Sequence, residues 1–421
     1  MVTWREGVVL AVRSRRPGAV EYAVRLAPVA SAPPAVVAAV GYADLVGEAG
    51  VGERVLLTTD ALDEGLGTGG VAFVAALPDR VPAASEAAGE TGEGWEAGTR
   101  GRTRAGGEAG ATGSRGRVVK VRYTPLQTLV PAVEDHDSLH HELLREADDL
   151  AGLPVVVADL HSALPAVLAA LRQDAPSARV AYVMTDEAAL PLAFSRAVAA
   201  LREAGWLAGV VTTGQAFGGD LDSVTLHSGL LAARHVLSAD AVVVAPGPGG
   251  VGTGTRWGFT GVAAGEAVNA VGTLGGRAVG ALRVSGADPR ERHRGLSHHS
   301  RTAYGRVALT SADLPVPVPP PASVDSDGGD GPAGADAAAT CRLRELQPLL
   351  QRQVSDLVGG ARARLTAYDV DVTGLVTALH AGPAPLSSMG RSLQEDPVAF
   401  LAAAAAGRHA ATLLPCRVRR P

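Results

Sequence analysis

The densest group of side chains that could carry chemistry lies between Asp288 and Arg301. This segment reads Asp-Pro-Arg-Glu-Arg-His-Arg-Gly-Leu-Ser-His-His-Ser-Arg. Arginine presents a planar fork of donors that matches phosphate or carboxylate oxygens, and histidine can bind a metal or carry protons near neutral pH. We predict binding of the anionic part of a ligand by Arg290, Arg292, Arg294 and Ser297, and catalysis by His298 and His299. The alternative is a solvated loop whose arginines pair with Asp and Glu.

A glycine-rich segment earlier in the chain could hold an anion. Residues 247–252 match the pattern G-x-G-x-x-G, in which glycines permit positive φ and let backbone N–H groups approach a ligand. A dinucleotide fingerprint opens its helix at once and has an acidic residue about 20 positions further on. Here residues 253–259 intervene, and the stretch near residue 270 offers only Glu266 and Asn269. We therefore predict an anion-binding loop, with a glycine-rich turn as the alternative. The predicted ligand-binding residues are Gly247, Gly249, Gly250, Gly252, Thr253, Gly254 and Thr255.

Polar side chains also follow three other apolar runs that have the composition of strands. In open α/β sheets, ligands bind beyond the carboxyl ends of the strands. The predicted catalytic residues at these ends are Asp159, His161 and Asp186, and the predicted ligand-binding residues are Thr185, Gly218, Gly219 and Asp220. Because the carboxyl ends of parallel strands share one edge, we expect these residues to line one cleft with the 247–255 loop.

The carboxylates and imidazoles named above could also bind a divalent metal, which is the candidate cofactor. No pair of them has a recognised ligand spacing, so burial or helix capping is the alternative for each. His136 and His140 would share one face of a helix, as polar surface residues often do. The sequence has no G-x-S-x-G elbow and no phosphate loop of the G-x-x-x-x-G-K type.

Apolar strands that alternate with helical patterns must position these side chains. The predicted strands are 154–159, 178–185, 208–214, 241–246 and 276–285. The predicted helices are 162–173, 189–204, 223–236 and 261–274. Near-continuous apolar strands fit a sheet covered on both faces, and repeated strand–helix units give parallel strands. The pattern predicts an α/β fold with a doubly wound, mostly parallel Rossmann-like central sheet.

Composition shifts divide the rest of the chain. The predicted parts are a small β-barrel-like domain at 1–80, a disordered low-complexity linker at 81–117, the α/β core at 118–313, a Pro/Gly-rich linker at 314–340 and a helical α+β segment at 341–421. Short β-type runs separated by turn residues indicate the barrel, and segments unable to bury apolar surface indicate the linkers. In the last part, Asp396 before Pro397 is typical of a helix start.

Overall composition limits the classes of partner. The 421 residues carry a net charge of −5, which gives no general attraction to nucleic acid or to an anionic membrane. The two cysteines, Cys341 and Cys416, lack the spacing of a disulfide framework or a metal site. Residues 1–7 do not resemble a secretory signal, and the apolar run 397–406 is too short to span a bilayer. We expect a cytoplasmic protein whose partner is an anionic small molecule rather than a membrane or nucleic acid, and a homo-oligomer stays open.

Several motifs together resemble a known family. They are Trp4-Arg5-Glu6-Gly7, residues 65–70, residues 122–127, Ala158-Asp159-Leu160-His161-Ser162, residues 247–255 and Gly295-Leu296-Ser297-His298-His299. The sequence resembles an uncharacterised bacterial family catalogued as domain of unknown function 3866. The resemblance covers most of the chain outside the two predicted linkers, and residues 81–117 look like an insertion. It implies one shared architecture in the cytosol, and no activity, cofactor or catalytic residue.

The leading hypothesis is a protein that binds an anionic small molecule, phosphorylated or nucleotide-like, at the carboxyl ends of the central strands. It is a candidate hydrolase or transferase, in which the glycine loop holds the anion and the 290–301 segment neutralises its charge. The alternative is a non-catalytic adaptor or regulatory protein whose N-terminal β domain binds protein or RNA. A pocket lined by the named side chains favours the first hypothesis. Exposed, ion-paired side chains and a separate basic or apolar patch favour the second.

Overall fold

The computed structural model describes residues 2–28, 35–63, 70–80, 118–321 and 332–415. They form two compact units, Met1–Val130 and Pro131–Pro421. The predicted linker at 81–117 lies outside the described residues, and so do residues 64–69, which hold most of one glycine motif.

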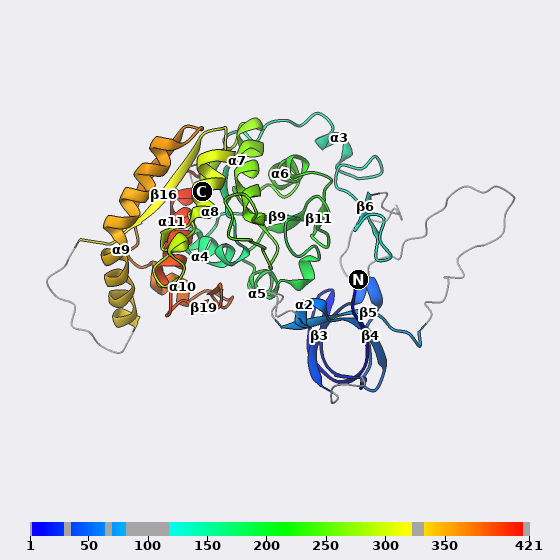
Figure 1. The fold of residues 1–421 in the computed structure, drawn as a ribbon. Coiled ribbons are helices and arrows are strands. Elements are labelled where there is room, and N and C mark those ends of the chain that lie inside the picture. The colour runs from blue at the N-terminus through cyan, green and yellow to red at the C-terminus, as the bar shows by residue number, and fades with distance from the viewer. Residues whose placement is uncertain (1, 29–34, 64–69, 81–117, 322–331, 416–421) are drawn as a thin grey trace. The chain divides into compact units, whose positions relative to one another are not determined.

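The first unit contains a closed barrel of five strands, which Figure 1 shows along its axis in blue. The strands are β1 (Trp4–Arg16), β2 (Ala19–Leu26), β3 (Val36–Tyr42), β4 (Arg54–Thr58) and β5 (Val71–Ala76), in the order β1-β2-β3-β5-β4. All neighbours are antiparallel except β3 and β5, and the short helix α1 (Ala43–Val46) lies between β3 and β4. This connectivity is that of an OB-fold. It confirms the prediction of a small N-terminal β-barrel.

Alternating side chains fill the interior of the barrel. On β2, the buried residues Val20, Tyr22 and Val24 occupy every second position and belong to one apolar cluster. The Tyr22 hydroxyl accepts a hydrogen bond from the backbone N–H of Ala49 at 3.0 Å, which satisfies a polar group inside the cluster. The remaining elements of this unit are α2 (Asp60–Asp63) and the antiparallel pair β6 (Val118–Lys120) and β7 (Thr128–Val130).

The second unit is built on a sheet of eight strands in which every neighbouring pair is parallel. The strands are β8 (Pro154–Val157), β9 (Val180–Thr185), β10 (Gly209–Thr212), β11 (Leu221–Asp222), β12 (Ala241–Pro246), β13 (Arg277–Gly280), β16 (Ala312–Val318) and β17 (Leu365–Asp371). Their order is β11-β10-β9-β12-β8-β13-β16-β17, which differs from the 3-2-1-4-5-6 order of dinucleotide-binding Rossmann folds.

Helices cover both faces of this sheet. In the view of Figure 1, α6 (Leu226–His235) and α7 (Ala263–Thr273) lie above it, and α4 (Leu164–Asp174) and α5 (Arg196–Glu203) lie below it. The central strands β8, β9 and β12 are therefore buried at every position, as their continuous apolar runs require. The predicted doubly wound, parallel α/β fold is confirmed.

The chain segments that follow β8 and those that follow its two neighbours in the sheet lie on opposite faces of the sheet. The chain leaving β8 passes through α4 on one face of the sheet. The chains leaving its neighbours β12 and β13 pass through α7 and through α8 (His298–Thr302) on the other face. Ligands of open α/β sheets bind beyond the carboxyl ends of the strands at such a switch point. The loops after β8, β12 and β13 therefore occupy the position where a site is expected.

The C-terminal part continues the same sheet, which corrects the predicted linker at 314–340. Strand β16 contains Pro315 and Pro317, and prolines at such close spacing are what predicts a linker here. In a parallel strand, alternate residues hydrogen-bond to opposite neighbours. The carbonyl of Val318 accepts a hydrogen bond from the chain after β17, so the prolines face the other side, where pairing with β13 ends at Asp313. The missing N–H groups of the prolines are therefore not needed.

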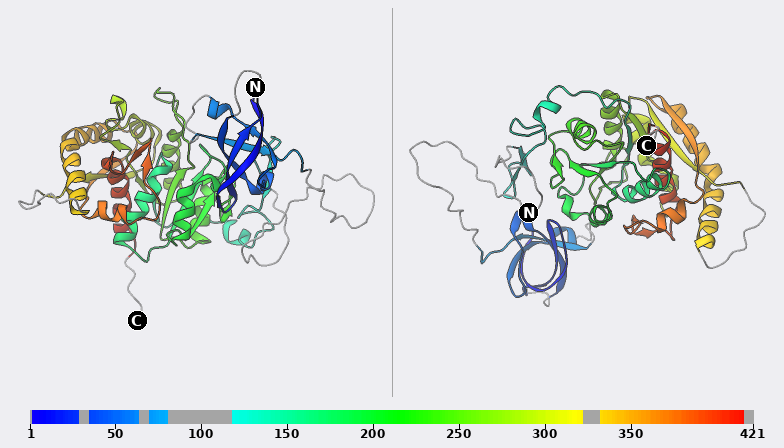
Figure 2. Two further views of the ribbon diagram at one scale, coloured as in Figure 1. Left: turned by 90° about the horizontal axis from the view of Figure 1, so that it is seen from below. Right: turned by 180° about the vertical axis from the view of Figure 1, so that it is seen from behind.

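Two helices of the C-terminal part cover the end of the sheet formed by β16 and β17. Helix α9 (Pro332–Gly360), which begins inside the predicted linker, runs beside these strands (Figure 2). Helix α11 (Pro397–Thr412) packs along α4, and Gly407 permits this approach because a Cβ there would lie 2.0 Å from the carbonyl oxygen of Val167. None of the helices in the described part of the chain is long and apolar enough to cross a membrane. The remaining elements are α3 (His141–Leu144), β14 (Val284–Ser285), β15 (Gly295–Leu296), α10 (Leu375–His380), β18 (Ser387–Ser388) and β19 (Arg391–Ser392).

Candidate functional site

A pocket lies where the chain after β8 and after β13 meets the start of α11, and we call it the polar pocket because charged side chains stand among the apolar ones of its lining. Its volume is about 40 Å³, which is room for about three water molecules or one small polyatomic group. Its polar lining consists of Asp159, Ser162, Arg283, Ser285, Asp288, His293, Ser388, Arg391 and Asp396. Segments far apart in the sequence therefore place charged groups of both signs around one small space at the switch point of the sheet.

Asp159 follows β8 and is almost fully buried, with 5% of its side chain exposed. Its Oδ2 atom lies 3.7 Å from Arg283 Nη1 and 3.7 Å from His299 Nδ1. This oxygen has no hydrogen-bond partner among the described residues. A buried carboxylate oxygen without a hydrogen bond costs free energy. Asp159 is therefore an acceptor with capacity for one more hydrogen bond or a proton.

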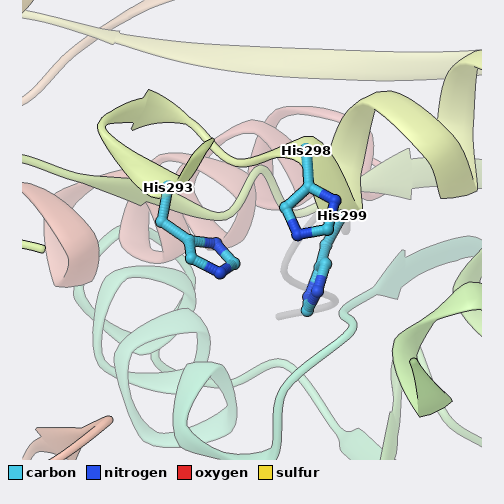
Figure 3. A group of neighbouring side chains, drawn as sticks. All are labelled: His293, His298 and His299. Carbon is cyan, nitrogen blue, oxygen red and sulfur yellow. The ribbon is translucent and has the colours of Figure 1, made fainter. Parts of the chain in front are cut away.

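Three histidines lie together (Figure 3), and one of them, His299, approaches Asp159. His293 ends a short helical turn, and His298 and His299 begin α8, whose N-cap is Ser297. The Ser297 hydroxyl oxygen accepts a hydrogen bond from the backbone N–H of His299 at 3.2 Å and lies 2.8 Å from His293 Nδ1. One ring nitrogen from each histidine lies within 4.8 Å of the others, so this histidine cluster could hold a metal ion. His298, His299 and Ser297 were predicted site residues, and His293 was not.

Two of these imidazoles are neutral near pH 7. Burial, together with the positive charge of Arg283, lowers the pKa of His293 to about 3. Burial also lowers the pKa of His298 to about 4, with contributions from the neighbouring His299 and Arg292. A neutral imidazole has a lone pair with which it can bind a metal or accept a proton.

His299 joins three parts of the site. Its ring stacks on Phe259, with 3.8 Å between ring centroids and 4° between planes. Arg283 Nη1 lies 2.7 Å from its Nδ1, and because a guanidinium can only donate, Nδ1 accepts this hydrogen bond. Its other nitrogen faces the glycine loop, since a Cβ at Gly252 would lie 3.8 Å from Nε2. The loop after β12 and the 290–301 segment therefore lie together at this ring.

The glycine loop has geometric reasons for its composition. Gly249 and Gly254 have φ angles of +96° and +77°, which favour glycine, and a Cβ at Gly247 would lie 2.4 Å from a backbone oxygen of a neighbouring loop. The hydroxyls of Thr253 and Thr255 hydrogen-bond to each other at 3.0 Å. The loop is exposed throughout residues 249–258. These contacts explain several of the glycines, and anion binding by the loop stays a prediction.

His161, a predicted catalytic residue, does not line the pocket. Its Nε2 lies 2.7 Å from the Ser195 hydroxyl, and its Nδ1 lies 3.2 Å from both the Pro246 carbonyl and the Tyr182 hydroxyl. Burial lowers its pKa to about 4. A neutral ring with both nitrogens engaged links the ends of β8, β9 and β12 to the start of α5. The contacts give His161 a structural position, which is a correction to the expected cleft.

Thr185 is the last residue of β9 and Asp186 follows it, and the two make different contacts. Asp186 Oδ2 accepts a hydrogen bond from the backbone N–H of Gln215 at 2.7 Å and so holds the loop after β10. Thr185 lines a second cavity of about 10 Å³ together with Asp159 and Glu187, which is room for one water molecule. Burial raises the pKa of Glu187. Thr185 is therefore near Asp159, whereas Asp186 is engaged in packing of the neighbouring loop.

Asp220 lies away from the carboxyl edge of the sheet, which is a second correction to the expected cleft. Its backbone N–H donates to Val210 O at 2.8 Å, and its Oδ2 accepts from Val210 N at 2.8 Å. It also forms an ion pair with Arg202. Val210 is near the start of β10, so the chain has turned back along this strand before β11 begins. Gly218, with φ of +95°, and Gly219, where a Cβ would lie 2.6 Å from a backbone oxygen, belong to this turn.

The arginines predicted to bind an anion differ in their contacts. Arg290 pairs with Asp288 through two contacts, Nε to Oδ1 at 2.9 Å and Nη2 to Oδ2 at 2.8 Å. The hydrogen-bonded guanidinium holds the pKa of Asp288 well below its usual range. Arg292 and Arg294 are exposed, and their side chains form no hydrogen bond or ion pair within the described part of the chain. The charge of Arg290 is therefore balanced by Asp288, and anion binding by the other two stays a prediction.

A network from the C-terminal part was not predicted from the sequence. Arg391 bridges two carboxylates, with Nη2 3.0 Å from Asp288 Oδ2 and Nε 3.3 Å from Asp396 Oδ2. Asp396 occupies the start of α11 as predicted, but its carboxylate accepts hydrogen bonds from the Ser285 hydroxyl and from Gly286 N instead of capping the helix. The one signal in the sequence is an Arg and an Asp five residues apart before an apolar helix.

Comparison with known proteins places the whole site inside one family. No curated protein and no solved structure matches the chain. The sequence matches the family described as "Protein of unknown function (DUF3866)" over residues 38–407, a range that includes the pocket and the histidine cluster. The match covers most of the chain and confirms the resemblance found in the sequence. The chain therefore belongs to the DUF3866 family.

Proposed function

We propose that this protein binds the phosphoryl or carboxylate group of a small anionic molecule at the polar pocket and the adjoining histidine cluster, and acts on it as a hydrolase or transferase. The position of Arg283 carries the proposal. Its side chain is buried, with 11% exposed, yet Asp159 approaches it only to 3.7 Å and its hydrogen bond goes to the ring of His299. A buried guanidinium without a hydrogen-bonded carboxylate is costly, and a bound anion would remove that cost.

The balance of charge around the pocket also supports an anionic ligand. The two carboxylates at the C-terminal side, Asp288 and Asp396, are already paired with Arg391. Arg292 and Arg294 have no ion pair among the described residues. A local excess of positive charge raises the concentration of anions near a site and their rate of association.

The arrangement suggests how the side chains would divide the chemistry. The neutral imidazoles of His293 and His298 can accept a proton from a water or hydroxyl nucleophile. Arg283 would stabilise negative charge that develops on the bound group. A cavity of about 40 Å³ accepts only that group, so the rest of the ligand would lie outside. The neighbouring glycine loop exposes 54% of Trp257, a surface on which a sugar or base could stack.

Thermal shift assays on the full-length protein test this function. We expect inorganic phosphate, sugar phosphates or nucleotides to raise the melting temperature, because a ligand that binds the folded state alone stabilises it, by about 2.7 kcal/mol at 100 times its Kd. In the double variant Arg292→Ala/Arg294→Ala, the ligand-induced shift should be lost while the melting temperature without ligand stays unchanged. The matched control is Arg352→Ala, an exposed arginine on α9, which should keep the shift.

Two results would overturn the proposal. One is the absence of stabilisation by every anion in the screen. The other is a double variant that melts lower without ligand and responds to anions as the wild type does, because the two arginines would then be structural.

The OB-type barrel supports a second candidate function, that of an adaptor binding RNA or protein. OB-folds commonly use the face of β2 and β3 and the adjacent loops to bind single strands, although fold alone does not determine function. The barrel exposes Trp4, 55% accessible, and the side chains of Arg13 and Arg15 on β1. Fluorescence anisotropy with a labelled single-stranded RNA tests this candidate. Binding that is lost in Trp4→Ala would support it, and no binding at low salt would exclude the RNA form.

A further inference from the structure

Two of the three histidines of the cluster have their Nδ1 atoms engaged by neighbouring side chains. His293 Nδ1 is engaged with the Ser297 hydroxyl at 2.8 Å, and His299 Nδ1 is engaged with Arg283 Nη1 at 2.7 Å. His298 Nε2 is buried and has no hydrogen-bond partner among the described residues. Nε2 is therefore the nitrogen left for a further ligand in His293 and His299, and in His298 it is a buried nitrogen without a partner among the described residues. Figure 3 shows the three rings around one common space, His293 on one side and His298 and His299 on the other.

We propose that His293, His298 and His299 bind one divalent transition-metal ion, Zn²⁺ in the first place, through these Nε2 atoms. Imidazole nitrogens suit Zn²⁺, and the histidine nitrogens already lie within 4.8 Å of one another. Nitrogens about 2 Å from one zinc ion must be closer together than this, and modest rotation of the side chains brings them there. Three protein ligands leave a fourth position for water or for an oxygen of a substrate, which is the pattern of catalytic zinc sites.

Ser297 has the position of an outer-sphere residue of such a site. Metal-binding histidines usually donate their second N–H to a nearby oxygen, which sets the tautomer and the orientation of the ring. With the metal on Nε2, His293 Nδ1–H would donate to the Ser297 hydroxyl oxygen at 2.8 Å. The same oxygen accepts the backbone N–H of His299, so one side chain orients two of the three ligands.

Asp159 is placed to accept a hydrogen bond from His299 when a metal is bound. A guanidinium only donates, so contact with Arg283 requires that the proton of the neutral His299 ring is on Nε2. When a metal occupies Nε2, the ring proton moves to Nδ1, and the ring keeps the same number of protons. Nδ1–H then needs an acceptor, and the unpartnered Asp159 Oδ2 lies 3.7 Å away. Arg283 would at the same time turn from His299 toward the pocket. Asp159 is thus a positioning residue for the metal ligand.

A bound zinc ion would support the proposed hydrolase function, but zinc binding does not depend on that function. A zinc ion there would occupy the nitrogens with which His293 and His298 otherwise accept a proton. A water at its fourth position would then take over as the nucleophile, because zinc lowers the pKa of bound water and polarises a phosphoryl or carbonyl oxygen. Zinc binding by itself requires no anionic ligand. The two proposals can therefore fail separately.

Titration of the metal tests the site directly. Full-length protein is treated with a chelator, exchanged into phosphate-free buffer at neutral pH and titrated with Zn²⁺ by calorimetry. We expect one Zn²⁺ per chain in the wild type and an affinity at least about 100-fold weaker in His298→Gln, where a ligand is lost. The control is His227→Gln, an exposed histidine on α6, which should bind Zn²⁺ as the wild type does. No binding by the wild type, or equal binding by His298→Gln, overturns the proposal.

Further measurements protect the test against a folding defect and address Asp159. Circular dichroism and melting of the metal-free variants identify misfolding, and His293→Gln provides a second ligand deletion with the same expected loss. Substitution of Co²⁺ in the wild type should give the visible absorption of a nitrogen-ligated ion. Asp159→Asn should keep one metal per chain but weaken its affinity by about 10–100-fold. Unchanged affinity in Asp159→Asn would overturn the role given to Asp159.

Discussion

Asp288 and Arg391 form an ion pair of 3.0 Å between Oδ2 and Nη2 although they are 103 residues apart in the sequence. The Asp288 side chain is buried, with 1% exposed, and Arg391 also reaches Asp396 at the start of α11. This pair connects the segment after β13 to the C-terminal helix. The pocket therefore depends on a part of the chain whose composition alone suggested a separate segment.

We expect Arg391→Met to destabilise the second unit. Removing one partner of a buried ion pair leaves a carboxylate with fewer favourable contacts, and such changes cost about 3–5 kcal/mol. Because Arg290 still holds Asp288, we expect a loss below this range, about 2–3 kcal/mol in the free energy of unfolding. Denaturant unfolding measures it. Arg352→Met on the exposed face of α9 should change stability by less than about 0.5 kcal/mol, and an equal loss there would contradict this explanation.

The buried ring of His161 should make the protein less stable in acid. Its pKa is lowered to about 4 in the folded state, whereas the unfolded chain takes up the proton near the ordinary value of 6.5. The contribution of His161 is therefore fully present above pH 6.5 and is lost as the pH falls toward 4. Between these values the slope from this one group is about 1.4 kcal/mol per pH unit.

Unfolding curves at several pH values between 7 and 4 check this expectation. In His161→Asn, the slope of the free energy of unfolding against pH should fall by the contribution of about one proton. His293 and His298 should contribute to the remaining pH dependence of stability, because burial lowers their pKa values as well. His227→Asn, at an exposed position, should leave the slope as in the wild type. A slope that is the same in His161→Asn and the wild type would show that this ring is solvated.

The contact between α11 and α4 should not tolerate a methyl group at Gly407. A Cβ there would lie 2.0 Å from the carbonyl oxygen of Val167, so the helices would have to move apart. We expect Gly407→Ala to cost about 1–3 kcal/mol, the range for overpacked cores. The matched control is Gly359→Ala on α9, where nothing lies within 4 Å of the new atom. There alanine should be neutral or stabilising by up to about 1 kcal/mol because of its higher helix propensity.

We expect Asp186 to stabilise the loop after β10 rather than to take part in catalysis. Its carboxylate accepts the backbone N–H of Gln215, so Asp186→Ala leaves that group without its partner. We expect a loss of about 1–3 kcal/mol in stability. The phosphate-induced thermal shift and the affinity for Zn²⁺ should not change. Loss of either at unchanged stability would return Asp186 to the catalytic role that the sequence suggested.

Local patterns were sufficient for the elements of the core. Apolar runs of four to eight residues separated by helical patterns predicted the strands β8, β9, β10, β12 and β13 and the helices between them. The largest differences are in the predicted helix 189–204, which begins only at Arg196, and in the predicted strand 276–285, which ends at Gly280. Burial on both faces was predictable for the same reason, since side chains alternate along a strand. The pattern failed at β16, where Pro315 and Pro317 suggested a linker. Their compatibility with a strand depends on which side of β16 has a hydrogen-bonding neighbour, and periodicity does not contain that information.

The roles of individual histidines and aspartates were decided by the tertiary structure. His161 and His299 belong to similar motifs, yet the first has both nitrogens engaged by protein groups and the second faces Arg283, Asp159 and the glycine loop. Asp220 follows a strand in the sequence but returns to the beginning of that strand. Residue type and the position after a strand are properties of a short segment. The partners of a side chain come from elements that are distant in the sequence.

Local sequence patterns were sufficient to predict the parallel α/β core, the barrel before it and the carboxyl edge of the sheet as the place of polar residues. These features follow from periodicity and composition over short windows, where the energetics are dominated by burial of nearby apolar side chains. The positions of Arg391 and Asp396 in the pocket lining, and of His293 beside His298 and His299, follow from long-range packing. Those associations arise from the order of strands in the sheet and the packing of α11 on α4, which bring together groups that no local pattern relates.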